Sequence, residues 1–395
     1  MHFLPRSRFI LIAALGLSAL AVQAAQPVKD LGIVKVKPSA EIGVRITSSS
    51  PEMQKLAVMA FGTHGKYKLI GSGFSYDIRF TSVAPTQVRV DVTKGAAGTP
   101  VISQTVAGTS ARHALLRAAD VAVEATNGLG LKGFFASKLT FIVQRAGNKG
   151  DVYVSDLFLG EASDVTRQNA LTMMPRWSPD GRRIIYTSFF KSGAPDIFTV
   201  DPVSGRKDTF ASFKGTNMGA RFSPSGQQVT MICGDGTSDV WVANAQRPLN
   251  AQRKTRSDSV KSSPAWSPDG SRIVFSMEPG PQLYVMSASG GAPQRLTTGY
   301  SYSAEPEWSV GNPNKIACTV RDGGSFKIAV YDLQTKSAVV VSKAGFDALE
   351  HGTVLRASCV FSIPSWAGSN PSRPRARRRC RPTCCRRHAE RSGFF

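Results

Sequence analysis

Short runs of alternating apolar and polar residues occupy the first third of the chain and predict β-strands. Residues 32–36 and 87–92 alternate in this way, and residues 74–80 are another strand candidate. Residues 100–106 read as a further strand, which forms a hairpin with residues 87–92 across the turn at residues 94–99. This part of the sequence therefore predicts several strands, two of them paired in a hairpin.

Helical spacing follows the last of these strands. Four apolar residues fall on one stripe of a helix: Ala111, Leu115, Ala119 and Val123. Ser110 stands before them as a suitable N-cap, and Asn127-Gly128 supplies a stop. Residues 51–61 predict another helix. Together these elements predict a small α/β domain over residues 25–135.

From residue 136 to about 350 the pattern changes to strands and turns in repeated units. After its first strand, each unit has an apolar strand, such as residues 183–186. A strand that carries an aromatic residue follows, such as residues 196–200. A turn and a polar strand such as residues 294–297 close the unit. Four short strands per unit are typical of a β-propeller blade.

Each unit opens with an aromatic-Ser-Pro-x-Gly motif at a nearly fixed interval. The motif reads Trp177-Ser-Pro-Asp-Gly, Phe222-Ser-Pro-Ser-Gly, Trp266-Ser-Pro-Asp-Gly and, degraded, Trp308-Ser-Val-Gly-Asn. The aromatics lie 45, 44 and 42 residues apart, a blade-sized period. Blades are predicted to begin near residues 171, 215, 259 and 300.

Structural roles explain the motif better than catalytic ones. The aromatic supplies a large apolar plug for the seam between blades. Proline cannot sit within a ladder and ends the strand, and glycine accepts the positive φ of the tight turn.

The net charge of +22 is concentrated near the end of the chain. Residues 371–395 hold nine Arg and one Glu, a net charge of +8. The remaining basic residues form no long stripe, so the folded part predicts a solvated basic surface and no nucleic-acid partner.

The N-terminus has the pattern of a secretory signal peptide over residues 1–24. Arg6 and Arg8 precede the short apolar run 9–22, and Ala24 offers a cleavage site. No later stretch is apolar enough for a membrane span. An exported mature protein in the periplasm, with no transmembrane segment, is expected.

Other chemical motifs are weak. Residues 128–133 fit G-x-G-x-x-G but follow a helix and precede a strand, the reverse of a dinucleotide site. No G-x-S-x-G, H-E-x-x-H or Walker motif occurs. Cys233 and Cys318 lie two blades apart and do not suggest a disulfide. We predict no catalytic residue, cofactor or metal.

The motif units, the segment Gly133-Phe-Phe-Ala-Ser-Lys-Leu-Thr-Phe141 and the α/β domain behind a leader resemble the TolB family, the periplasmic component of the Tol-Pal envelope system. The resemblance covers residues 105–350 well and is weaker over residues 26–104. It implies an α/β domain followed by an all-β, six-bladed-type propeller, here incomplete at the C-terminus.

The resemblance also implies function. Such a protein is a scaffold and not an enzyme, supports outer-membrane integrity and cell division, and binds a Pal-like lipoprotein through one propeller mouth. The mature N-terminus would contact a TolA-like protein, although residues 25–34 depart from the family pattern. Carried over by position, the mouth residues are Thr172, Met173, Met174, Asn217, Met218, Lys261, Ser262, Ser263, Ala304 and Glu305.

Two alternatives stay open at this point. One is an exported propeller that binds a small ligand or ion in its channel, and the other is a propeller associated with a peptidase. A fold of this kind does not choose between them.

The blade pattern stops near residue 350. An Arg-, Pro- and Cys-rich run over residues 351–395 follows where another motif is expected. Our hypothesis is a change of reading frame near codon 350. The alternative is a basic tail that binds nucleic acid or anionic lipid.

Overall fold

The computed structural model describes residues 41–127, 133–145, 147, 149–246, 248–342 and 362–363. The leader, the predicted strand at 32–36 and most of the G-x-G-x-x-G segment lie outside the described residues. So does the basic run at 371–395.

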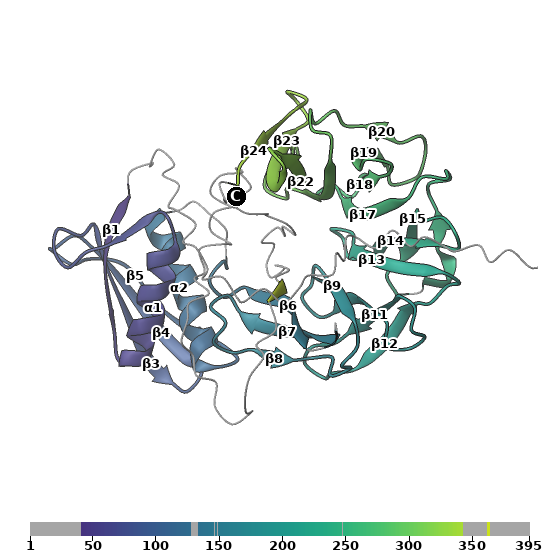
Figure 1. Cartoon of the computed structure of the whole chain (residues 1–395). Coiled ribbons are helices and arrows are strands. Elements are labelled where there is room, and N and C mark those ends of the chain that lie inside the picture. Colours follow the sequence, from purple (N-terminus) through teal and green to yellow (C-terminus); the bar gives the residue numbers. More distant parts are fainter. Residues whose placement is uncertain are drawn as a thin grey trace, which may run out of the picture. The chain divides into compact units, whose positions relative to one another are not determined.

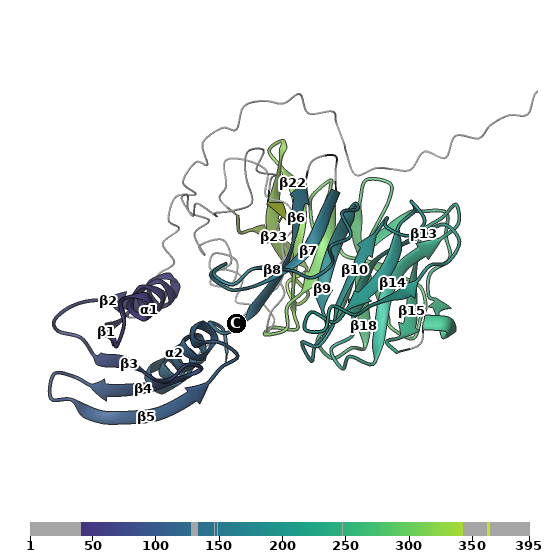
Figure 2. The same ribbon diagram turned by 90° about the horizontal axis from the view of Figure 1, so that it is seen from below.

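The first described domain is a five-stranded sheet with both helices on one face (Figures 1 and 2). Strand order is β2-β1-β3-β4-β5. β1 is parallel to β2 and β3, whereas β3, β4 and β5 are antiparallel. The elements are β1 (Ile42–Ser48), α1 (Pro51–Thr63), β2 (Tyr67–Leu69), β3 (Tyr76–Ala84), β4 (Gln87–Lys94), β5 (Thr99–Ala107) and α2 (Ala111–Asn127).

Local sequence explains these elements. The Ser50 hydroxyl accepts from Met53 N at 3.3 Å at the start of α1. Ser110 accepts from His113 N at 3.1 Å at the start of α2, which confirms the predicted N-cap. In β4 every second residue is buried on the helix side. The predicted α/β domain is confirmed, with β1 and β2 added to it.

The rest of the described chain forms five four-stranded sheets (Figure 1). Blade I contains β6 (Lys138–Arg145), β7 (Lys149–Asp156), β8 (Ser163–Asp164) and β25 (Ser362–Ile363). β25 is parallel to β6, whereas every other blade pairing is antiparallel.

Blades II to V share one order. Their first strands are β9 (Thr172–Trp177), β13 (Thr216–Phe222), β17 (Lys261–Trp266) and β21 (Ser303–Trp308). Their second strands are β10 (Ile184–Ser188), β14 (Gln228–Gly234), β18 (Arg272–Met277) and β22 (Lys315–Asp322). The third strands are β11 (Asp196–Val200), β15 (Asp239–Asn244), β19 (Gln282–Ser287) and β23 (Ser325–Asp332). The outer strands are β12 (Lys207–Ala211), β16 (Gln252–Arg253), β20 (Gln294–Arg295) and β24 (Ser337–Val340). A 3₁₀ turn, η1 (Pro248–Asn250), precedes β16.

The blade count differs from the resemblance. The described residues hold five blades where six are implied. The blade architecture itself, with four strands per unit, is confirmed.

Apolar clusters join each blade to the next, and a motif aromatic enters every one. Trp177 packs with residues of blade I, and Phe222 with residues of blade II. Trp266 packs with blade III, and Trp308 with blade IV. All four aromatics are buried. The predicted role of the motif aromatic as a seam plug is therefore confirmed.

Candidate functional site

The first strands of blades II to V share one sequence frame, which we number from the motif aromatic as position 0. These strands also contact their neighbours, β9 with β13, β13 with β17 and β17 with β21 (Figure 1). Positions −4 and −3 of the four strands form what we call the rim: Met173, Met174, Met218, Gly219, Ser262, Ser263, Ala304 and Glu305.

Position −3 adopts the left-handed conformation in all four blades. The φ angles are +54° at Met174, +65° at Gly219, +50° at Ser263 and +53° at Glu305. The pairing register shifts at the same point of each strand, so the ladder is bulged there. A side chain in this conformation costs about 1–2 kcal/mol. Such strain persists where the surrounding structure enforces it, and it clusters at functional sites.

Hydroxyl groups of the preceding blade hold two of these bulges. Gly219 N–H donates to Thr187 Oγ1 at 3.2 Å, and Glu305 N–H donates to Ser276 Oγ at 3.1 Å. Both hydroxyl-bearing residues are buried on second strands. The backbone of the rim is therefore tied across the seam between blades.

The rim side chains divide into two halves. Blades II and III present Met173, Met174 and Met218, all partly exposed. Blade IV presents two serines, and blade V presents Glu305, whose Oε2 accepts from Thr319 Oγ1 at 2.8 Å. Thioether side chains adapt to irregular surfaces. The rim thus combines an adaptable apolar half with a polar half that carries a carboxylate.

Position −5 has a different role. It is polar and buried in all four blades: Thr172, Asn217, Lys261 and Ser303. Thr172 Oγ1 lies 3.2 Å from Ser188 Oγ, and Asn217 Nδ2 donates to Phe213 O at 2.7 Å. Three of the residues that the sequence placed at the mouth therefore brace the loops from inside. The seven others belong to the rim.

Lys261 is the position −5 residue with the most extensive polar contacts. Its ammonium is buried, 3.0 Å from Asp239 Oδ1, and donates to Ser257 O at 2.7 Å. Asp239 also accepts from Thr255 Oγ1 at 2.7 Å and from Arg253 Nη2 at 2.5 Å. A buried ammonium is tolerated only when it is paired and hydrogen-bonded, as here.

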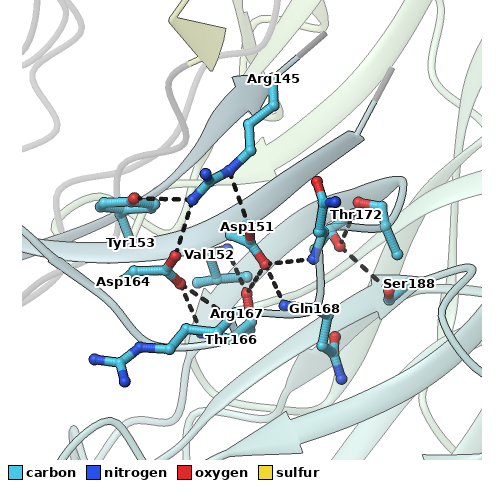
Figure 3. A network of polar contacts seen from close by, with 12 residues as sticks. Arg145, Asp151, Val152, Tyr153, Asp164, Thr166, Arg167, Gln168, Thr172 and Ser188 are labelled. Atoms are coloured by element: carbon cyan, nitrogen blue, oxygen red, sulfur yellow. Dashed lines mark hydrogen bonds and ion pairs between the residues drawn. The ribbon is translucent and has the colours of Figure 1, made fainter. Parts of the chain in front are cut away.

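A buried aspartate also holds the loop that follows blade I, without a buried ammonium (Figure 3). Asp151 Oδ1 accepts from Thr166 Oγ1 at 3.0 Å and from Gln168 N at 2.6 Å, while Arg145 Nε lies 3.4 Å from Oδ2. Val152 N donates to Thr166 Oγ1 at 2.9 Å. The signal that could have revealed it is an Asp at the start of a third strand with a Thr 15 or 16 residues later.

An ion pair links position −1 of blades III and V. Arg221 Nη1 pairs with Glu307 Oε2, and the two side chains are 14% and 15% exposed. Blade IV lies between them in the chain and carries only a methyl group at this position, on Ala265. Reduced exposure to water strengthens such a pair. It couples two blades that are not neighbours in sequence.

The motif residues themselves serve the seams. Trp266 Nε1 donates to Arg221 O at 3.1 Å. A Cβ added to Gly226 would lie 3.8 Å from Pro179 Cδ, so the turn of one blade packs on the turn of the preceding one. The Arg272 guanidinium lies 4.7 Å above the Trp308 ring. These contacts support the structural reading of the motif.

Exposed apolar side chains lie in the loops beside the first strands. Leu171 and Val260 directly precede β9 and β17, and Phe213 lies shortly before β13. Phe189 N donates to Leu171 O at 3.0 Å, which sets the loop carrying exposed Phe190 beside the start of β9. Sequence reasoning missed these residues, although large apolar residues within polar loops were a visible signal.

Two negative findings apply to the described residues alone. None of their helices has the length and apolar character needed to cross a membrane. Nor do three His, Cys, Asp or Glu side chains gather there as a metal site requires. Cys233 and Cys318 are buried free thiols, and burial raises the pKa of each to about 12.

The sequence matches the TolB β-propeller domain over residues 128–351, more than half of the chain. The chain belongs to the TolB β-propeller family. Tol-Pal system protein TolB of Bordetella pertussis is 30% identical over 165 residues, which are 41% of this chain and 37% of that protein. The Bordetella bronchiseptica protein of the same name matches equally. The chain thus aligns with well under half the length of these TolB relatives.

The fold is also similar to a solved TolB structure. The crystal structure of TolB from Acinetobacter baumannii superposes with a TM-score of 0.68 at 19% identity, covering 78% of this chain and 85% of that one. At this identity the similarity concerns the fold. It supports the order of an α/β domain followed by a propeller.

Proposed function

We propose that this chain is a non-enzymatic periplasmic scaffold of a Tol-Pal-like system, which binds a peptidoglycan-associated lipoprotein and supports outer-membrane integrity and cell division. Membership of the TolB family supports this proposal, as do relatives named Tol-Pal system proteins. The predicted signal peptide fits the same compartment. The rim is the surface that we assign to the lipoprotein.

The observation that carries this assignment is the repeated left-handed residue at position −3. Three of the four blades place a non-glycine residue there, at a cost to backbone stability. The core does not explain that choice, because Met174, Ser263 and Glu305 are partly exposed. A binding role for these side chains would explain it.

The proposal is tested with the purified soluble domain of the Pal-like lipoprotein from the same genome. Isothermal titration would compare the parent with Glu305→Gln, which removes the charge and keeps an acceptor for Thr319 Oγ1. Glu52→Gln, an exposed site on α1, is the matched control. Loss of a charged contact of about 1.4 kcal/mol raises Kd about tenfold. The control should stay within twofold.

A second pair examines the apolar half of the rim. Met174→Ala should weaken binding several-fold, whereas Met59→Ala on α1 should not. If Glu305→Gln and Met174→Ala both bind the lipoprotein as the parent does, the rim is not the contact surface. If the parent itself shows no binding, the lipoprotein is not the partner.

We also propose that the sixth blade implied by the family is encoded in another reading frame after codon 350. The abrupt change to an Arg- and Cys-rich composition supports this idea. Translating the gene in its other two frames tests it. An aromatic-Ser-Pro-x-Gly unit in neither frame would favour the basic-tail alternative.

A further inference from the structure

Two neighbouring loops at one end of blade II each expose a phenylalanine that is followed by a lysine. The loop between β10 and β11 carries Phe190-Lys191, and the loop between β12 and β13 carries Phe213-Lys214. Phe190 is 55% exposed and Phe213 is 37% exposed. Large apolar side chains that gather on a surface mark a contact site.

Hydrogen bonds hold these loops side by side. Phe189 N donates to Leu171 O at 3.0 Å, and Asn217 N donates to Pro195 O at 3.1 Å. The Asn217 side chain donates to Phe213 O at 2.7 Å and accepts from Phe213 N at 3.1 Å. Loops that are fixed in this way lose less freedom on binding. We call the following residues the corner: Leu171, Phe190, Lys191, Phe213 and Lys214.

The charge of the corner is positive. Its two loops contain two exposed lysines and no acidic residue. Lys214 Nζ lies 2.6 Å from Asp235 Oδ2 of blade III, whereas Lys191 takes part in none of the ion pairs among the described residues.

This combination of residue types suits a lipid surface better than a protein partner. Lysine is depleted in the contact surfaces of protein complexes. At the surface of an anionic bilayer, in contrast, an aromatic ring enters the headgroup region and a neighbouring ammonium meets lipid phosphates. The repeated Phe-Lys pair matches that arrangement in both loops.

We propose that the corner docks on an anionic phospholipid surface, where Phe190 and Phe213 enter the headgroup region and Lys191 and Lys214 bind lipid phosphates. The contact is peripheral and reversible, because the apolar area of the corner is small. A lysine near such a surface strengthens binding by about fivefold. This inference goes beyond the function proposed for the rim and concerns other residues.

The opposite end of blade II supplies matched controls. β11 begins directly after the first corner loop and runs away from it. The turn between β11 and β12 carries Val203, which is 92% exposed, and the exposed Lys207 begins β12. If exposure alone governed binding to lipid, substitutions at the two ends of the blade would have equal effects.

Co-sedimentation of the full chain with vesicles tests the proposal. Vesicles of phosphatidylethanolamine with phosphatidylglycerol should bind the parent, and vesicles of phosphatidylcholine should bind it far more weakly. Lys191→Gln should weaken binding to the anionic vesicles about fivefold and Phe190→Ser several-fold. Lys207→Gln and Val203→Ser should stay within about twofold of the parent. Equal losses at both ends, or no loss in the corner variants, would overturn the proposal.

A fluorescent probe at position 190 reports insertion at the corner itself, whatever the basic run at 371–395 binds. The four tail cysteines are first changed to serine: Cys359, Cys380, Cys384 and Cys385. Phe190→Cys and Val203→Cys are then labelled with an environment-sensitive dye, since Cys233 and Cys318 are buried. Anionic vesicles should shift the emission of the probe at 190 to the blue and leave the probe at 203 unchanged. Equal responses at the two positions would refute insertion of the corner.

The vesicle assays contain no lipoprotein, so their outcome is independent of the function proposed for the rim. If vesicles leave the probe at 190 unchanged but the purified lipoprotein domain alters its emission, the corner contacts protein and the lipid assignment is wrong. Unchanged thermal unfolding of the variants excludes misfolding as the cause of any loss.

Discussion

Substitution of Gly219 by alanine measures the energetic cost of the bulge at position −3. Its φ is +65°, and an added Cβ would lie 3.7 Å from Pro264 Cδ and 3.8 Å from Met174 Sδ. Both are ordinary contact distances, so the methyl group fits. The cost is then that of the left-handed backbone, about 1–2 kcal/mol. Reduced freedom of the unfolded chain returns about 0.4–1 kcal/mol. The expected net destabilisation is about 1 kcal/mol.

Urea unfolding followed by tryptophan fluorescence would measure this change. Gly181→Ala is the matched control, with φ +68° and nothing within 4 Å of the added Cβ, so it should cost the same. Gly215→Ala should cost several kcal/mol, because its Cβ would lie 2.2 Å from Gly234 O. If Gly219→Ala resembled Gly215→Ala, position −3 would not accept a side chain equally in all blades. The four-fold equivalence of the rim would then be wrong.

Three further changes probe other parts of the fold. Glu307→Gln leaves the largely buried Arg221 guanidinium without its anionic partner, so it should destabilise the fold by about 2 kcal/mol. A double-mutant cycle of Arg221 and Glu307, measured by urea unfolding, should show coupling between the two residues. Additive effects would refute the ion pair. Arg272→Ala removes the cation above Trp308 and should cost about 1 kcal/mol by thermal unfolding, whereas no shift would show that the contact contributes nothing. Burial raises the pKa of the Asp120 carboxyl from 3.8 to about 7 against two backbone N–H donors, so the contribution of Asp120 to stability should be fully present below about pH 4 and be lost as the pH rises through about 7. Asp120→Asn should flatten that slope in urea midpoints measured from pH 4 to 8, and an unchanged slope would refute the assignment.

The repeat could be recognised in the sequence because every blade must pack against its neighbour in the same way. A large aromatic, a strand-ending proline and a turn glycine are needed at every seam, so they recur at a fixed period. β4 and α2 could be predicted from local patterns as well, β4 from its alternation and α2 from its N-cap. β2 could not, because three residues carry no periodicity. β1 was missed although Ile42, Val44 and Ile46 alternate cleanly.

The site was less predictable than the fold. Position along the first strand was enough to find seven of the eight rim residues. It was not enough to separate them from Thr172, Asn217 and Lys261, because polar residue types do not reveal whether a loop buries them. The partner of Lys261 is Asp239, 22 residues earlier and in the preceding blade. Only the blade-to-blade connection brings them together.

The left-handed bulge explains why the rim can vary while the motif cannot. Position 0 is aromatic in every blade because it fills a seam, but position −3 is Met, Gly, Ser or Glu in successive blades. In a regular strand, alternation would force such a residue to face the core or the opposite side. The bulge interrupts that alternation at position −3. The residue type at this position is therefore set by contacts outside the propeller and not by packing in the core. Of the four residues, only Gly219 carries a sequence signal for positive φ. Comparing the repeats within one chain is therefore the way to recognise such a rim, since three of its members give no sign of their conformation.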